Sequence, residues 1–403
     1  MNKTDVSETL APGENEAASL HFRVGAILFL AGIFFSNMLA RIILAPMMPL
    51  IEKDLKLGHD QAGGLVFTAT LGYSLMLLGS GFVSARLTHR RTVGLSGIAV
   101  GGAAAIVFLS HDLWGMRFGL FLLGMSAALY FPSGIATITG LVVSRDWGKA
   151  MAIHELAPNL SFILAPLLVE VLLRWCSWRQ TIMLSGIGCL LMGIVFLRYG
   201  KGGGFPGEAP NLRTLRVILA NRSFWLLMLF FCLIIGVAFG VYSMLPLYLV
   251  AERGVARGWA NTWVGLSRIP TLITSLLAGW AADRLGLKYT MKVLLLSTGI
   301  LTILLGIVPG DWFVPIVFLQ AICSTAYFPV GFATLSRISS SEVKNVAVSL
   351  TVPVSVLVGA GAIPAGLGIA GELGSFSVGF AILGGCFLAV SFLVGRLELP
   401  DRQ

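Results

Sequence analysis

The amino-acid sequence predicts an all-α membrane protein with twelve transmembrane helices, arranged as two parallel six-helix repeats. Composition is the first observation: 56% of the 403 residues are hydrophobic and 12% are charged, whereas a soluble domain carries roughly 25% charged residues. The second is a series of apolar runs of about 20 residues, each long enough to cross a bilayer core as a helix. The third is a set of motifs that recur at an offset of 197 or 198 residues.

Hydropathy divides the chain into two halves of six spans. A polar, acidic segment, 1–21, is typical of a disordered cytoplasmic tail. The N-terminal half then covers 22–199 and the C-terminal half 222–396, with a short tail at 397–403. Between them lies a cytoplasmic linker, 200–221, whose glycines and prolines argue against a spanning helix. The expected spans are 22–50, 60–86, 92–110, 112–143, 149–173, 180–199, 222–251, 258–284, 289–309, 311–339, 342–371 and 374–396.

Basic residues predict the orientation in the membrane. Of the 28 Lys and Arg residues, 19 fall on the side of the termini and linker and six on the opposite side, while Arg41, Arg117 and Arg268 lie within spans. The positive-inside rule therefore predicts cytoplasmic termini, in a bacterial inner membrane. The net charge of +9 is then a topology signal and does not indicate a nucleic-acid partner. The five cysteines form no metal-binding or disulfide pattern, so we expect no metal and no cofactor.

The internal repeat is visible in three pairs of motifs. An even number of spans separates the two copies, so both halves share one orientation, and a binding site is expected between them near the membrane midplane. The pairs are Pro49-Leu50 with Pro246-Leu247, Gly81–Leu87 with Gly279–Leu285, and Tyr130–Thr137 with Tyr327–Thr334.

The loop after the second span of each half resembles the signature of the major facilitator superfamily, G-x-x-x-D-R-x-G-R/K-R/K. The second copy, Gly279–Lys288, matches with Asp283, Arg284 and Gly286. The first copy is degenerate, because Ala85 replaces the acid and Thr88 the glycine, although Arg86 is retained. The resemblance covers about 22–396 and implies the twelve-helix fold of that superfamily, with alternating access of a central site.

The resemblance also implies gating residues. In the family this loop forms a cytoplasmic charge network that latches one conformation, and here Asp283, Arg284 and Arg86 would supply it, with the missing acid weakening the N-terminal copy. Arg117, followed by Gly124, is similar to the family's fourth-helix arginine, for which we expect a structural or coupling role. Trp178-Arg179 before the sixth span also fits the family.

Two arginines inside spans are the main candidates for substrate binding. An ionisable residue within a span is costly and should face the bundle interior. Arg41 in the first span and Arg268 in the eighth come from different halves, and neither has an acid within one turn. Guanidinium groups match carboxylate and phosphate oxygens. Arg41 resembles the first-helix arginine of organophosphate:phosphate antiporters and anion:cation symporters, and Arg268 resembles the eighth-helix arginine of monocarboxylate and oxalate transporters. Structural pairing or snorkelling is the alternative for each.

Other ionisable residues in the spans have weaker interpretations. His154 and Glu155 lack the second histidine of a zinc motif, so we expect them either to carry a proton or to make cytoplasmic gating contacts with Arg117 or Lys149. Glu170 is expected to pair with Arg174 one turn later.

Polar and aromatic residues of the spans could line the cavity, with plain helix packing as the alternative. Their rings would also suit an apolar or unsaturated substrate. These candidates are Asn37, Tyr73, Tyr130, Asn159, Tyr242 and Tyr327.

These residues together predict a transporter and not an enzyme, since no nucleotide loop or nucleophile–base arrangement is present. We expect a monomer in the lipid bilayer that takes up a small organic anion, a carboxylate, together with a proton, although uniport or anion exchange fits as well. The alternatives are a drug or metabolite efflux antiporter, which the absence of glycine from 149–173 disfavours, and a non-transporting sensor.

Overall fold

The structure, a computed structural model, describes residues 19–207, 219, 221–338 and 344–398. Its N-terminal half contains the first six crossings. In order they are α1 (Leu20–Ile42) with α2 (Leu44–Leu55), α3 (His59–Leu87), α4 (His89–Leu109), α5 (Leu113–Ala128) with α6 (Tyr130–Leu141), α7 (Trp147–Leu172) and α8 (Trp178–Tyr199).

The C-terminal half repeats this order. Its crossings are α10 (Arg222–Ile235) with the π-helical turn η3 (Gly236–Val241) and α11 (Tyr242–Ala251), α12 (Arg257–Leu266) with α13 (Thr271–Leu285), α14 (Leu287–Ile307), α15 (Phe313–Ile338), α16 (Lys344–Ser355) with the π-helical turn η5 (Val356–Ala362) and α17 (Ile363–Glu372), and α18 (Phe376–Ser391).

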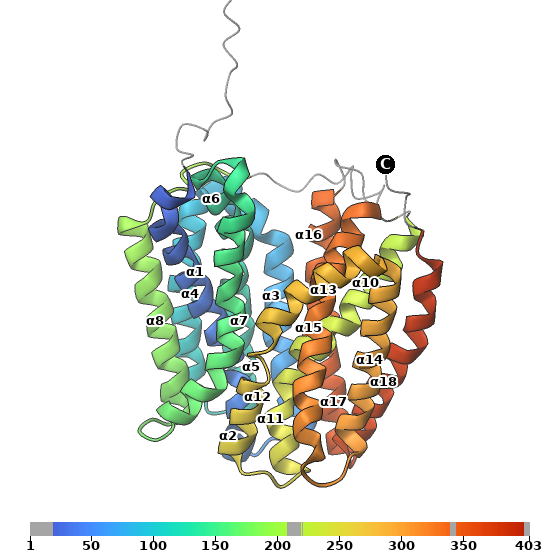
Figure 1. Ribbon diagram of the computed structural model, residues 1–403. Coiled ribbons are helices and arrows are strands. Elements are labelled where there is room, and N and C mark those ends of the chain that lie inside the picture. The colour runs from blue at the N-terminus through green and yellow to red at the C-terminus, as the bar shows by residue number, and fades with distance from the viewer. Residues whose placement is uncertain (1–18, 208–218, 220, 339–343, 399–403) are drawn as a thin grey trace, which may run out of the picture.

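Eleven helices of the described residues are long and apolar enough to cross a membrane. The eighth crossing is the exception because it is broken: α12 has 10 residues and α13 has 15, with a turn at 267–270 between them. Figure 1 shows the two pieces following one another through the molecule. The twelve predicted spans are thus present, and Ser267 and Pro270 lie in the break.

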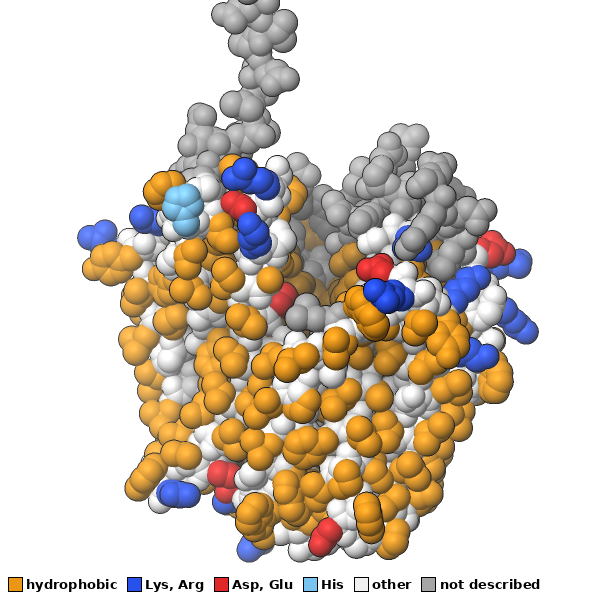
Figure 2. Space-filling model, in the orientation of Figure 1, with side chains coloured by type: hydrophobic (Ala, Val, Ile, Leu, Met, Phe, Trp, Pro, Cys, Tyr) orange, Lys and Arg blue, Asp and Glu red, His pale blue; other side chains and the backbone are white. Residues whose placement is uncertain are grey.

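The outer surface of the bundle is apolar. Large hydrophobic side chains such as Phe82, Leu191, Ile273 and Ile382 are exposed. Figure 2 shows them over the side of the molecule, with most of the visible Lys, Arg, Asp and Glu side chains near its two ends. A surface of this kind suits lipid and not water.

Close helix crossings depend on small residues. A Cβ on Gly124 of α5 would lie 1.9 Å from the carbonyl oxygen of Ala69, and one on Gly72 of α3 would lie 2.1 Å from that of Phe121. The backbones of α3 and α5 therefore touch, as is common where helices associate in membranes.

The turn after the second span is built alike in both halves. Gly286 has φ 89° and Thr88, at the corresponding place, has φ 78°, a conformation that glycine adopts freely and threonine does not. The linker contacts this turn in the N-terminal half. Gly203 and Phe205 accept hydrogen bonds from the backbone N–H groups of Arg90 and His89 at 2.7 and 3.1 Å.

The two halves meet at one end of the molecule and separate at the other. Contacts between them are made by α2 with α11, α3 with α17, and α7 with α12. Figure 1 places the start of α1 and the end of α8 together with the start of α10 and the end of α18 at the opposite end. Figure 2 shows that end hollowed between the halves. The molecule is therefore open on the side of its termini and closed on the other, which we call the outer side.

Candidate functional site

Arg41 lies beside the break in the first crossing, between α1 and α2. Its guanidinium carbon is 3.7 Å from the ring centre of Tyr73 on α3, which is a cation–π contact. Arg41 also donates a weak hydrogen bond to the sulfur of Met38, at 3.8 Å.

Arg268 lies in the break of the eighth crossing, between α12 and α13, and is 8% exposed. Its guanidinium donates to the carbonyl oxygen of Ala238 at 2.9 Å and lies 4.7 and 5.3 Å from the rings of Tyr242 and Phe162. Its Nε has no hydrogen-bond partner.

The two arginines occupy related places in the repeat. Ala238, to which Arg268 donates, stands 197 residues after Arg41. Each guanidinium therefore sits where the first and second crossings of its own half meet. Ala238 belongs to the π-helical turn η3, and such turns are frequent at functional sites.

A cavity of about 70 Å³ lies between the halves, with Arg41 on its wall. The rest of its lining is mostly apolar or aromatic: Met38, Ile42, Leu44, Ala45, Val66, Ala69, Thr70, Phe162, Phe239, Tyr242, Ser243 and Ala360. A space of this size holds a few water molecules, so a larger substrate needs the halves to move.

Phe162 and Tyr242 separate the two arginines. Tyr242 of α11 donates a hydrogen bond to the carbonyl oxygen of Phe162 on α7 at 2.9 Å, across the interface of the halves, and the two rings meet edge to face. Both rings line the cavity on one side, and Arg268 lies against both of them. In this conformation the expected clamp is incomplete, because Arg41 borders the cavity and Arg268 is covered by the ring pair.

His154 forms a buried polar group with its neighbours in the N-terminal half. It is 0% exposed and stacks on Phe34 at 4.5 Å. Its Nε2 is 3.2 Å from the hydroxyl of Tyr130, and its Nδ1 is 3.2 Å from a carboxylate oxygen of Glu155. Asn159 donates to the backbone carbonyl of Glu155 at 2.8 Å, which is a contact within α7.

Two other predicted cavity residues are buried in helix packing. The amide of Asn37 donates to the hydroxyl of Ser96 on α4 at 3.2 Å, inside the N-terminal half. Tyr327, the repeat partner of Tyr130, is 0% exposed and its hydroxyl has no partner.

The predicted gating residues do not come together here. Arg117 stacks on Trp114, 4.9 Å away near the start of α5, and not on His154 or Glu155; Lys149 pairs with Asp146 instead. Arg284 packs on Trp280 at 4.9 Å. Within the part of the chain that the structure describes, Asp283 and Arg86 make no hydrogen bond or ion pair. The prediction of a latch formed by Asp283, Arg284 and Arg86 stays a prediction.

The outer closure contains an ion pair that the sequence did not indicate. Glu170 of α7 is ion-paired with Arg257 of α12, whose Nε lies 3.0 Å from the carboxylate. The carboxylate accepts hydrogen bonds from Nη2 of Arg257 at 3.2 Å and from the amide of Asn261 at 2.5 Å. Asn261 also donates to the carbonyl oxygen of Pro46 at 3.2 Å. The prediction that Glu170 pairs with Arg174 is wrong, because the Glu170 carboxylate contacts the other half of the molecule instead.

A second group closes the outer side between α3 and α17. The backbone N–H of His59 donates to Glu372 at 2.7 Å, while its side chain meets Glu52 at 2.6 Å. We call these contacts and those of Glu170 the outer lock.

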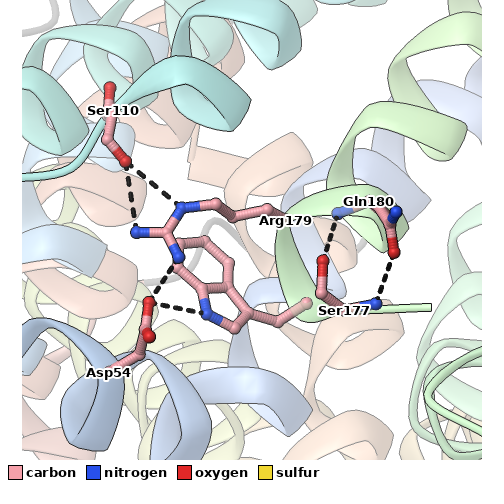
Figure 3. Close-up of polar contacts among 6 residues, drawn as sticks. Asp54, Ser110, Ser177, Arg179 and Gln180 are labelled. Atoms are coloured by element: carbon pink, nitrogen blue, oxygen red, sulfur yellow. Dashed lines mark hydrogen bonds and ion pairs between the residues drawn. The ribbon is translucent and has the colours of Figure 1, made fainter.

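Arg179 joins three elements of the N-terminal half, as Figure 3 shows. It is ion-paired with Asp54 of α2 and donates to the carbonyl oxygen of Ser110 after α4. The neighbouring Trp178 donates to the same carboxylate at 3.2 Å. Trp178-Arg179 thus has a structural role here.

The charge around the cavity is positive. Among the described residues, no carboxylate makes an ion pair with Arg41 or Arg268. Burial removes water from a guanidinium, and an unpaired buried cation is unfavourable. The site can therefore gain stability from an anion.

Comparisons with known proteins agree with the fold. A family model described as Major Facilitator Superfamily matches residues 30–269, and one described as MFS/sugar transport protein matches 204–341. Among solved structures, a bacterial homolog of the human lysosomal transporter Spinster, inward-facing and occupied, is 16% identical, covering 94% of this chain and 98% of that one, with a TM-score of 0.79. A D-xylose-proton symporter is also 16% identical, with coverages of 95% and 98% and a TM-score of 0.75.

The curated relatives carry several different names. A probable hexose phosphate transport protein of Chlamydia trachomatis is 24% identical over 71% of this chain and 69% of its own. The membrane sensor protein UhpC of Salmonella typhimurium is 24% identical over 69% and 68%. A probable 4-methylmuconolactone transporter of Cupriavidus pinatubonensis is 24% identical over 84% and 80%. Because the first family model spans more than half of the chain, the protein belongs to the major facilitator superfamily.

Proposed function

We propose that this protein is a secondary transporter that takes up a small carboxylate with an apolar body, together with a proton, by alternating access. The observation that carries the proposal is Arg41, which lies on the wall of a cavity between the halves without a carboxylate partner among the described residues.

The cationic side chains supply the binding energy for an anion. The guanidinium of Arg41 has lost hydrogen bonds to water through burial. A bound carboxylate would replace them with two charge-assisted hydrogen bonds. Arg268 becomes available when Phe162 and Tyr242 separate, and that contact crosses the interface at which the halves rock. The second arginine would therefore join the anion during the conformational change.

The lining favours an apolar body over a sugar. Apart from the guanidinium of Arg41, the polar side chains of the cavity lining are the hydroxyl groups of Thr70, Tyr242 and Ser243. The hydroxyls of Thr70 and Tyr242 already donate to backbone carbonyls, and that of Ser243 donates to Gly240. A hexose would lose water from several hydroxyls without gaining partners, which is costly, whereas rings of Phe162 and Phe239 suit an unsaturated or aromatic body.

A phosphate ester is the second candidate. The relatives named hexose phosphate transport proteins favour it, and two arginines suit a dianion. The structure offers the sugar little in this conformation, so the phosphate ester requires a cavity that opens to polar residues elsewhere.

The first experiment is thermal unfolding of the purified protein with benzoate, cis,cis-muconate and glucose 6-phosphate. A ligand that binds only the folded state stabilises that state by about 2.7 kcal/mol when its concentration is a hundred times Kd, and the melting temperature then rises. We expect benzoate and muconate to stabilise the parent, and Arg41→Ala to abolish the effect. Arg117→Ala, an arginine in a span away from the cavity, is the matched control and should respond as the parent does.

Three outcomes would change the proposal. Stabilisation by glucose 6-phosphate alone would select the phosphate ester. An unchanged response of Arg41→Ala would remove the arginine from the site. If muconate binds but is not accumulated in proteoliposomes that are acidic outside, uptake with a proton is wrong, and a sensor or an exchanger replaces it.

A further inference from the structure

We infer that His154 and Glu155 together hold one exchangeable proton, bound between the imidazole Nδ1 and the carboxylate. This inference rests on the proposed function and names the group that carries its proton. It follows from the number of hydrogens available to Tyr130, His154 and Glu155.

Tyr130 determines which nitrogen of His154 carries a hydrogen. The hydroxyl of Tyr130 lies 2.6 Å from the carbonyl oxygen of Leu30. Two oxygens approach this closely when a hydrogen lies between them, and a carbonyl has none, so the tyrosine donates its single hydrogen to Leu30. The hydroxyl oxygen can then only accept from Nε2 of His154, 3.2 Å away.

The other ring nitrogen then needs a second proton. A neutral imidazole with its hydrogen on Nε2 has a bare lone pair on Nδ1. Nδ1 is 3.2 Å from an oxygen of Glu155, and an ionised carboxylate there would place two acceptors face to face. The contact is favourable when one proton lies between them, either as imidazolium with carboxylate or as neutral imidazole with carboxylic acid.

Few other charged groups lie near this pair. On α1 the ring of Phe34 stacks against the imidazole. Tyr130 on α6 and Tyr73 on α3 both interact electrostatically with Glu155. On α7 itself, Lys149 is paired with Asp146.

The proton has a route in and out. His154 is 0% exposed, whereas the side chain of Glu155 is 49% exposed. A proton therefore reaches the buried nitrogen through the carboxylate.

The pair is linked to the cavity through Tyr73. Glu155 acts on Tyr73, and the ring of Tyr73 lies 3.7 Å from the Arg41 guanidinium. An unprotonated pair adds negative charge near Arg41 and opposes a bound anion, while a protonated pair removes that charge. Proton binding should strengthen anion binding, and by thermodynamic reciprocity an anion should strengthen proton binding. Because the two ligands strengthen each other's binding, the anion and the proton are carried together, which is symport.

The test measures proton uptake when an anion binds. Purified protein in weakly buffered detergent solution is mixed with muconate at pH values between 5.5 and 8.5, and the pH change is recorded. We expect uptake of up to one proton per protein over part of this range, and tighter muconate binding at the acidic end. Glu155→Gln should lose the uptake, because the glutamine amide can donate to Nδ1 in place of the proton, and its muconate affinity should no longer vary with pH.

A second measurement reports on the tautomer directly. In protein labelled with ¹⁵N-histidine, the His154 signal, assigned with His154→Gln, should show a hydrogen on Nε2 across the pH range. Tyr130→Phe removes the hydroxyl that fixes this tautomer, and we expect the midpoint of the pH dependence to move while muconate still binds.

The outcomes separate this inference from the proposed function. If Glu155→Gln still takes up a proton when muconate binds, the pair is not the carrier. A neutral His154 with its hydrogen on Nδ1 would also overturn the inference. In either case thermal stabilisation by muconate that depends on Arg41 would leave the anion site intact, whereas loss of that stabilisation in the parent would overturn the proposed function itself.

Discussion

Replacing Glu170 with glutamine should open the outer side of the molecule. The carboxylate is ion-paired with Arg257 and accepts one hydrogen bond from Nη2 of Arg257 and one from the amide of Asn261. Through these contacts Glu170 joins α7 to α12 in the outer lock. Glutamine keeps the shape of the side chain but loses the charge and one acceptor, and its amide hydrogens face the donors of Arg257.

The size of the effect follows from the burial of the pair. The side chains of Arg257 and Glu170 are 29% and 22% exposed, so the pair is neither fully solvated nor fully buried. An exposed ion pair contributes about 0.2–1 kcal/mol, and a hydrogen bond to a charged group about 1.5–3 kcal/mol. A partly exposed pair should then contribute about 1–2 kcal/mol, which is a change of about five- to thirtyfold in the ratio of outer-open to outer-closed molecules.

Distances between spin labels measure this ratio. Trp175 follows α7 and Leu373 follows α17, and both are highly exposed at the outer side. Labels at Trp175→Cys and Leu373→Cys, with the five native cysteines replaced, report the separation of the halves there. In Glu170→Gln the ratio of long to short distances should rise about five- to thirtyfold over the parent.

The control is another charge on the same side. Lys53→Gln removes an exposed charge of α2 that makes no ion pair among the described residues, and it should leave the distances unchanged. An unchanged distribution in Glu170→Gln would refute the reasoning, and so would an equal shift in Lys53→Gln, which would reflect net charge and not the lock.

Three further changes test other parts of the structure. Asp54→Asn should lower stability by about 0.2–1 kcal/mol, because Arg179 loses its half-exposed ion-pair partner; thermal unfolding in detergent measures it. Gly124→Ala should reduce folded yield or cost about 1–3 kcal/mol by overpacking, while Gly102→Ala, with nothing within 4 Å of its Cβ, should be tolerated, as size-exclusion chromatography would show. Phe205→Ala should loosen the linker, since its ring contacts His89, and should raise amide hydrogen exchange at 203–207.

Hydropathy and the repeat predicted the fold closely because both are properties of single helices. A span expected at 222–251 is observed from Arg222 to Ala251. The break of the eighth crossing at Arg268 also followed from local residues, since a proline at 270 removes a backbone donor. The first crossing breaks at Ile43, between α1 and α2, and Pro46 three residues later likewise removes a backbone donor.

Contacts between the halves were not predictable in the same way. Glu170 has a basic residue one turn away, Arg174, and helix geometry alone favours that pair. Its actual partner, Arg257, is 87 residues further along the chain, and nothing in the spacing distinguishes it from other basic residues. The covering of Arg268 by Phe162 and Tyr242 depends likewise on how the two halves dock. His154 and Glu155 were found because they are adjacent in sequence, although their partner Tyr130 comes from another helix.

The π-helical turns η3 and η5 give the two halves different mechanical properties. Each turn contains one residue more than a regular helix needs, and η3 and η5 lie against one another in the C-terminal half, where a Cβ on Gly240 would meet the carbonyl oxygen of Gly359 at 2.6 Å. The described part of the N-terminal half has no such turn. Deleting one residue from η3 would restore a regular helix and rotate α11 by about 100°, which would carry Tyr242 away from Phe162. The surplus residue therefore sets the angular position of the Tyr242 ring against Arg268.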